Sequence, residues 1–297
     1  MSAILSPRLG VPLLMLLATV FAGNHIAARL AFDHGASVPA AVAVRSGATA
    51  LVMVALLLLQ RVPMALPRAT LARGLGIGVL VAMQSYCLYS AVAIIPVALA
   101  LLAFNTCPLL LVLLTWAVDG VHPGRRALVA MPLALLGLVL ALDIIGTLET
   151  MAGRWAEIGA GVAWALGAAT TFALTLFLTT KHLKDVDGRM RTLLTMGTTA
   201  VIVGLAGGLA GNLALPTDGT GWLGLVLLTV LYGSAITAIF TVVPRLGAAT
   251  NTTALNFEPI AALVLGWVVL GQEMAARQML GALLVVAAVV LIGSRRH

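Results

Sequence analysis

The sequence is poor in charged residues. Only 9% of its 297 residues are charged and 5% are aromatic, whereas about a quarter of the residues in a soluble globular domain are charged. Hydrophobic residues make up 61% of the chain, and its mean hydropathy is +1.11. This balance excludes an ordinary soluble domain and indicates a protein that crosses a membrane several times.

Residue patterns of enzymes and metal sites are also missing. The two cysteines, Cys87 and Cys107, lie in apolar stretches without the CxxC or Cys/His spacing of a zinc site. They are interpreted as packing residues. HExxH, GxSxG, a P-loop and an acidic cluster are absent, and Asp185 and Asp187 lie in a basic loop. We therefore expect no enzyme activity, no cofactor and no metal.

Apolar stretches of about 20 residues, the length of a membrane-spanning helix, fill most of the chain. They lack the alternating pattern of a membrane barrel, and the first is too long for the core of a cleaved signal. Ten are expected, and no soluble domain is left between them. They cover 11–31, 39–59, 72–93, 96–118, 126–145, 157–180, 190–211, 221–243, 247–270 and 276–293.

Basic residues are unevenly distributed between the predicted loops. If the N-terminus is cytoplasmic, 13 of the 17 lie on the inner side, two on the outer side, and Arg29 and Arg45 lie within helices. The positive-inside rule then places both termini in the cytoplasm. The net charge of +7 is thereby explained without nucleic acid. The predicted partner is the lipid bilayer of the cytoplasmic (inner) membrane.

One short pattern occurs twice, as Asn105-Thr106-Cys107-Pro108 and Asn256-Phe257-Glu258-Pro259, at a spacing of 256 − 105 = 151 residues. Trp116/Trp267, Gly120/Gly271 and Arg126/Arg277 recur at the same spacing, in a chain with only 5 Trp. Such matches predict a duplicated unit, with repeats at 1–147 and 157–297. Five helices per repeat is an odd number, so the second repeat is expected to be inverted. Transporters often have this architecture, with the substrate site near the midplane between the halves.

The two repeated prolines, Pro108 and Pro259, fall inside the predicted fourth and ninth helices. Each would free a backbone carbonyl there, which is tolerated where it faces protein or a cavity. They are therefore candidate hinges, or inherited kinks that serve packing only.

These features resemble the drug/metabolite transporter superfamily, specifically its ten-helix EamA-type permeases. Phe21-Ala22-Gly23-Asn24 followed by Arg29 is similar to that family's Trp-Gly-x-Asn then Lys pattern, with Phe for Trp and Arg for Lys. Trp164-Ala165-Leu166-Gly167 lies at the equivalent point of the second repeat, and Arg45 and the Asn-x-x-Pro segments also match. The resemblance implies two inverted five-helix repeats around a central cavity and export of small metabolites. Length, Trp164 and the Tyr86/Tyr89 pair are most like the aromatic amino acid exporters.

Glu258 and Arg45 are charged side chains within predicted helices, where a charge costs roughly 2.5 to 3.5 kcal/mol. Glu258 could bind a proton or a substrate ammonium, or be a structural carboxyl bonded to Thr252 or Thr253. Arg45 could bind a substrate carboxylate. The favoured interpretation is that Arg45 extends outward or pairs with Asp33, and Arg29 is expected to be an interface anchor.

Further polar and aromatic side chains could line a central cavity, although each could equally serve packing. Gln84, Asn105 and Trp164 lie nearest to the middle of their predicted helices. The full set of candidate substrate-binding residues is Asn24, His25, Arg45, Gln84, Tyr86, Tyr89, Asn105, Trp164, Tyr232, Asn256 and Glu258.

The function expected from these residues and the resemblance is export of amino acids, including aromatic ones, or similar metabolites by alternating access. Alternatives are an exporter of organic cations or drugs and, from a different class, a passive channel. Gly74 with Gly78, and other small-xxx-small pairs, are expected to pack helices within a monomer first and to form a weak homodimer only second.

Overall fold

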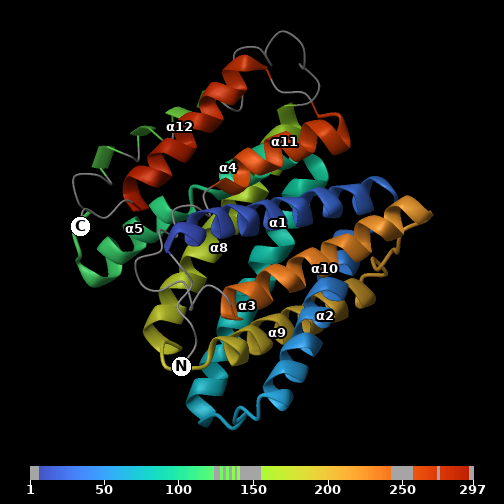
Figure 1. Cartoon of the computed structure of the whole chain (residues 1–297), viewed down its shortest axis with the longest axis vertical. Coiled ribbons are helices and arrows are strands. Elements are labelled where there is room, and N and C mark those ends of the chain that lie inside the picture. Colours follow the sequence, from blue (N-terminus) through green and yellow to red (C-terminus); the bar gives the residue numbers. More distant parts are fainter. Residues whose placement is uncertain are drawn as a thin grey trace.

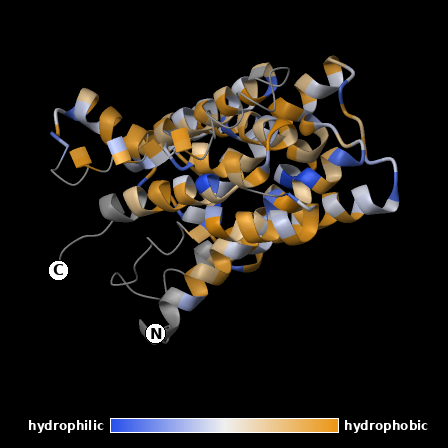
Figure 2. Ribbon diagram, turned by 90° about the horizontal axis from the view of Figure 1, so that it is seen from above, coloured by the Kyte–Doolittle hydropathy of each residue, from blue (hydrophilic) through white to orange (hydrophobic). Residues whose placement is uncertain are grey.

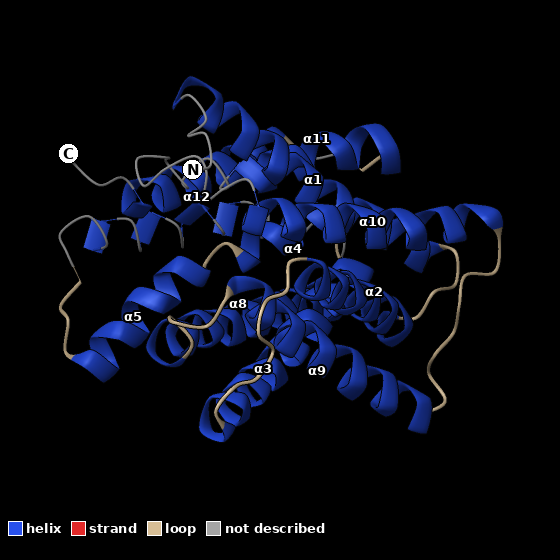
Figure 3. Cartoon of the chain, turned by 60° about the horizontal axis from the view of Figure 1, so that its bottom comes forward, coloured by secondary structure: helices blue, strands red, loops and turns tan. Residues whose placement is uncertain are grey.

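The computed structural model describes residues 7–123, 128–129, 132–133, 136–137, 139–140, 155–241, 257–272 and 275–293. In these residues the regular secondary structure is helical, and loops join the helices (Figure 3). The helices are α1 (Pro7–Asp33), α2 (Val38–Leu59), α3 (Arg68–Ile94), α4 (Val97–Phe104), α5 (Cys107–Asp119), α8 (Trp155–His182), α9 (Gly188–Leu209), α10 (Gly219–Thr241), α11 (Glu258–Leu270) and α12 (Ala276–Gly293) (Figure 1).

Seven stretches in the described residues are long and apolar enough to cross a membrane, with α4 and α5 together forming one of them. Two shorter apolar helices lie at 258–270 and 276–288. The all-helical membrane fold is thus confirmed. Most of the fifth expected span, and the first part of the ninth, lie outside the described residues. The count of ten and the inversion of the repeats therefore stay predictions.

The outer surface of the bundle is apolar. Leu51, Leu205 and Leu209 are 72%, 63% and 91% exposed, and hydrophobic residues cover much of the outside of the bundle in Figure 2, with hydrophilic ones in its middle and in the end loops. A soluble monomer rarely exposes such large contiguous apolar patches. The bundle therefore has the surface of a protein surrounded by lipid.

Helices from the two halves of the chain pack against each other. The main pairs are α1 with α10, α2 with α9, and α3 with α8 (Figure 1). A shift of 151 residues relates α1 to α8, α2 to α9 and α3 to α10, so exchanging the halves turns the α1–α10 pair into the α8–α3 pair. The α1–α11 contact has its counterpart in the α5–α8 contact. The main contacts between the two halves are therefore symmetric under their exchange.

Helices α5 and α11 correspond residue by residue. Their first residues differ by 258 − 107 = 151 and their last by 270 − 119 = 151. Each ends at a left-handed glycine, Gly120 at φ 69° and Gly271 at φ 63°. A side chain is disfavoured in this conformation. The glycines that recur in the sequence thus mark two equivalent helix ends.

The expected place of Pro108 inside a helix is wrong. A turn at Asn105 and Thr106 separates α4 from α5, and Pro108 is the second residue of α5. Pro259 is likewise the second residue of α11. At this position a backbone N–H has no partner within the helix, so proline costs nothing there. Each proline therefore begins a helix, and at the first site the interruption of the span is the Asn105–Thr106 turn.

Small residues bring α3 and α9 close together. A Cβ atom added at Gly74 would lie 2.6 Å from Leu194, and one at Gly78 would lie 2.6 Å from Thr198. The expectation that this glycine pair packs helices inside the monomer is confirmed.

Candidate functional site

Polar side chains from five helices meet inside the bundle. We call them the central polar cluster: Asn24 and His25 of α1, Arg45 of α2, Ser85 and Tyr89 of α3, Tyr232 of α10 and Glu258 of α11. Asn24, Arg45 and Tyr89 are 0%, 3% and 1% exposed. Buried polar groups of this kind are costly in a membrane bundle unless they are bonded or functional.

Arg45 is the most strongly connected member of the cluster. Its Nη1 donates to the Tyr89 hydroxyl at 2.9 Å and its Nη2 to the Ser85 hydroxyl at 3.1 Å. The guanidinium carbon also lies 3.9 Å from the ring centroid of Tyr232 and 4.8 Å from that of Tyr89. Such cation–π contacts are worth about 2 kcal/mol when desolvated. Two hydroxyls and two rings thus hold the guanidinium in one orientation.

Arg45 pairs with no carboxylate in the described part of the chain, and its Nε has no hydrogen-bond partner there. The expected outward extension of Arg45 or its pairing with Asp33 is wrong. Asp33 instead accepts from Nε of Arg29, at 2.8 and 3.0 Å. Arg29 also donates to the carbonyls of Val92 and Ile95, so it ties the end of α1 to the end of α3. Arg45 is left as a buried cation without a counter-ion among the residues that the structure describes.

His25 and Glu258 form a second part of the cluster. The Nε2 of His25 lies 3.3 Å from Oε1 of Glu258, and the His25 ring lies 5.5 Å from the ring of Tyr89. The other ring nitrogen, Nδ1, is buried without a partner among the described residues. Glu258 is the first residue of α11, where the helix N-terminus favours a negative charge. The expected partners Thr252 and Thr253 lie outside the described residues.

Tyr89 connects these two parts. Its hydroxyl accepts from Arg45 and donates to Oδ1 of Asn24 at 2.9 Å. Tyr232, the second ring beside the guanidinium, packs edge-on against Phe21, with centroids 6.2 Å apart, and its hydroxyl lies 3.6 Å from Sδ of Met196. The cluster therefore has a cationic end at Arg45, an anionic end at Glu258, and aromatic rings beside Arg45 and His25.

Several predicted site residues lie outside this cluster. Gln84 is half-buried and accepts weakly from Ser85 at 3.4 Å. Asn105 lies at the turn between α4 and α5, and its Nδ2 is buried without a partner in the described residues. Asn256 lies outside the described residues.

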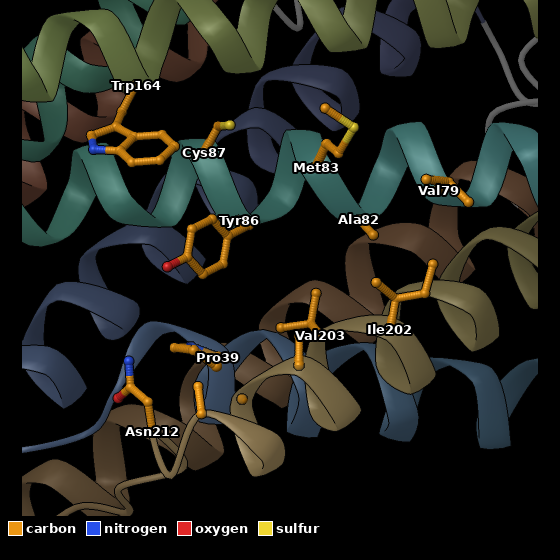
Figure 4. A pocket seen from close by; sticks show the side chains of 13 residues that line it. Pro39, Val79, Ala82, Met83, Tyr86, Cys87, Trp164, Ile202, Val203 and Asn212 are labelled. Carbon is orange, nitrogen blue, oxygen red and sulfur yellow. The ribbon is translucent and has the colours of Figure 1, made fainter.

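Tyr86 and Trp164 pack on each other instead, with ring centroids 5.9 Å apart. They line an apolar groove of about 490 Å³ among α2, α3, α8 and α9, shown in Figure 4. Cys87 and Asn212 line the same groove. Tyr86 and Trp164, which were expected to line the central cavity, therefore belong to a separate, mainly apolar surface.

Sequence reasoning did not single out Phe21 and Met196 as neighbours of the site. The repeat spacing was a usable signal for Met196, because 45 + 151 = 196 makes it the counterpart of Arg45. By the same arithmetic Leu176 is the counterpart of His25, and Cys107 of Glu258. Arg45, His25 and Glu258 thus have uncharged counterparts in the other repeat, so these three residues break the symmetry of the scaffold.

Comparison with known proteins agrees with the helical membrane architecture. The sequence pattern that defines the EamA-like transporter family matches residues 8–142 and again residues 159–294. A solved structure described as "Crystal structure of protein" has the same fold, with a TM-score of 0.61 over 95% of this chain and 95% of that chain at 18% identity. No curated protein matches the sequence.

Proposed function

Because this chain belongs to the EamA-like transporter family, we propose that it exports amino acids, including aromatic ones, by alternating access. Ten helices in two inverted five-helix repeats would cross the cytoplasmic membrane, with both termini in the cytoplasm. The substrate would bind in the central polar cluster, between the halves.

The observation that carries this proposal is the buried guanidinium of Arg45. A charge at the centre of a membrane helix costs roughly 2.5 to 3.5 kcal/mol, and Arg45 is 3% exposed without a carboxylate in the described residues. A substrate carboxylate would supply the missing anion. At about 4 Å, the attraction would be about 4 kcal/mol with an effective dielectric constant of about 20.

Glu258 supports a zwitterionic substrate rather than a simple anion. Its side chain is 27% exposed and lies beside His25, so its carboxylate is accessible to an ammonium group. The rings of Phe21, Tyr89 and Tyr232 lie along the cluster. A substrate with a carboxylate, an ammonium and an apolar or aromatic side chain matches these three kinds of group.

The packing of the helices supports alternating access. The main contacts between the halves are kept when the halves are exchanged, as expected of inverted repeats that reverse the accessible side of a central site. Since Arg45 is buried, substrate would reach it only when helices separate. The turn at Asn105 and Thr106, before Pro108, is the candidate hinge.

Counterflow in proteoliposomes tests the proposal. Vesicles loaded with unlabelled phenylalanine should accumulate labelled phenylalanine transiently and saturably, and leucine should compete. R45M vesicles are the control, because methionine occupies the equivalent position of the other repeat.

Two outcomes would contradict amino acid export. Stimulation by an organic cation such as tetraphenylphosphonium, with none by phenylalanine, would identify a cation exporter. Non-saturating electrical current without counterflow would identify a channel.

A further inference from the structure

We propose that His25 and Glu258 are the proton-carrying pair that couples export to inward proton flow. The proposal rests on the proposed function, since it concerns the energy source of the same transport cycle. It is carried by the geometry of the pair, by its place between the two halves of the chain, and by its counterpart in the other half.

The pair joins one element of each half. His25 is on α1 and Glu258 on α11, and these helices pack against each other. The Nε2–Oε1 distance of 3.3 Å allows one proton to be shared between them. His25 is 5% exposed, whereas the Glu258 side chain is 27% exposed. A proton can therefore reach the pair through Glu258 and be held on the buried imidazole.

The fold does not require charge at this position. The counterparts of His25 and Glu258 are Leu176 and Cys107, and these also lie together: Cys107 is buried in an apolar cluster against which Leu176 packs. The α5–α8 contact, which is the counterpart of the α1–α11 contact, is thus made by apolar side chains at these positions. A histidine–carboxylate pair placed where leucine and cysteine suffice is better explained by transport than by packing.

The helices packed around the pair carry other charged and titratable groups. They are Arg8, Arg29 and Asp33 on α1, Arg45 on α2, Arg68, Arg73, Tyr86, Cys87 and Tyr89 on α3, Tyr232 on α10 and Arg277 at the start of α12, while Val97–Phe104 of α4 contributes none. Of these, Tyr89 touches His25 and is itself bonded to Arg45. Tyr89 thus contacts both His25 and the cation that would bind the substrate carboxylate.

The charges balance for one proton per amino acid. With the proton bound, Arg45, His25 and Glu258 carry +1, +1 and −1, a net charge of +1. When a zwitterion binds from the cytoplasm, its ammonium takes the place of the imidazolium at Glu258, and His25 releases its proton to the cytoplasm. The loaded cluster then carries a net charge of zero. Each cycle moves one amino acid outward and one positive charge inward.

Steady-state accumulation measures this coupling independently of the transport rate. Vesicles one pH unit more acidic inside than outside, with the membrane potential clamped to zero, should accumulate labelled phenylalanine about tenfold, because one proton per substrate converts a tenfold proton gradient into a tenfold substrate gradient. In H25L and H25Q vesicles the accumulation ratio should fall to about one, whatever their rate. Leucine is the residue that the other repeat has at this position.

His34 provides the matched control. It forms a second histidine–carboxylate pair, Nδ1 to Oδ2 of Asp218 at 2.6 Å, near the ends of α1 and α10 and outside the cluster. H34Q should keep the tenfold accumulation. A second readout uses wild-type protein in weakly buffered detergent: saturating phenylalanine should release close to one proton per chain, and H25L should release none.

The outcomes separate the two proposals. Counterflow in the wild type with an accumulation ratio of about one would overturn the coupling and leave amino acid export standing. Tenfold accumulation by H25L would exclude His25 as the proton carrier. Absence of counterflow in the wild type would overturn amino acid export and, with it, the coupling.

Discussion

Replacement of Arg45 by methionine distinguishes a substrate-binding arginine from a structural one. Methionine is the counterpart at position 196, and it removes the charge while filling much of the same volume. The substitution removes two charge-assisted hydrogen bonds, to Tyr89 and Ser85, and also removes a buried charge. The two effects act in opposite directions on the free energy of unfolding.

The magnitudes partly cancel. Hydrogen bonds to a charged group are worth about 1.5 to 3 kcal/mol each, while a charge at the centre of a membrane helix costs about 2.5 to 3.5 kcal/mol. At the middle of each range, the two bonds are worth about 4.5 kcal/mol and the charge costs about 3 kcal/mol. We therefore expect R45M to lower the free energy of unfolding by about 1.5 kcal/mol, with the lost cation–π contacts partly replaced by sulfur–aromatic contacts of the methionine. Breaking a buried ion pair would cost about 3 to 5 kcal/mol, because the partner's charge is left uncompensated.

Binding should respond much more strongly than stability. Loss of the charge-assisted bonds to a substrate carboxylate, about 1.5 to 3 kcal/mol, corresponds to binding that is weaker by about 10- to 150-fold. R45K should lie between, because lysine keeps the charge but not the planar fork. Isothermal titration with phenylalanine and denaturant unfolding in micelles measure the two quantities. A loss of more than about 3 kcal/mol of stability with unchanged affinity would refute the assignment of Arg45 to the substrate.

Two further predictions concern the scaffold. G78V should destabilise the protein by about 1 to 3 kcal/mol, because a Cβ at Gly78 would lie 2.6 Å from Thr198. The control is G76A on the same helix, where a Cβ meets nothing within 4 Å, so this variant should be neutral or stabilising. Thermal melting in micelles compares the two variants. Asp187 caps α9, and the Arg189 side chain holds the pKa of its carboxyl at about 2, below the ordinary 3.8. D187A should therefore lower the free energy of unfolding by about 1 kcal/mol at pH 7. A carboxyl group whose pKa is lower in the folded than in the unfolded protein stabilises the fold while it is ionised, and it loses this effect as it is protonated. The difference between D187A and the wild type should therefore shrink as the pH falls from about 4 to 2. An unchanged difference at pH 2 would contradict the charge-based part of the cap.

The helical membrane fold could be predicted because it follows from local properties of the sequence. Apolar length alone identifies most spans. The equivalence of α5 and α11 also followed from a 151-residue spacing that the structure keeps at both helix ends. The break before Pro108 was missed, because proline fits both a kinked helix and the start of a new one.

The partner of Arg45 could not be predicted, because its contacts join three helices whose relative rotation is set by tertiary packing. The pairing of Asp33 with Arg29 could have been predicted, because the two residues are four apart, the spacing at which side chains on a helix meet. Trp164 was placed by depth, which fixes the height of a residue along its helix but not the face it occupies. The structure places it on the groove beside Tyr86.

The most direct test of amino acid recognition compares phenylalanine with two analogues, each of which lacks one of its two charged groups. Phenylalanine carries both charges, phenethylamine lacks the carboxylate, and 3-phenylpropionate lacks the ammonium. Equilibrium binding to the wild type should be at least about tenfold weaker for each of the two analogues, because each leaves Arg45 or Glu258 without its partner. Phenethylamine binding as tightly as phenylalanine would contradict the role of Arg45 and identify an organic cation as the substrate.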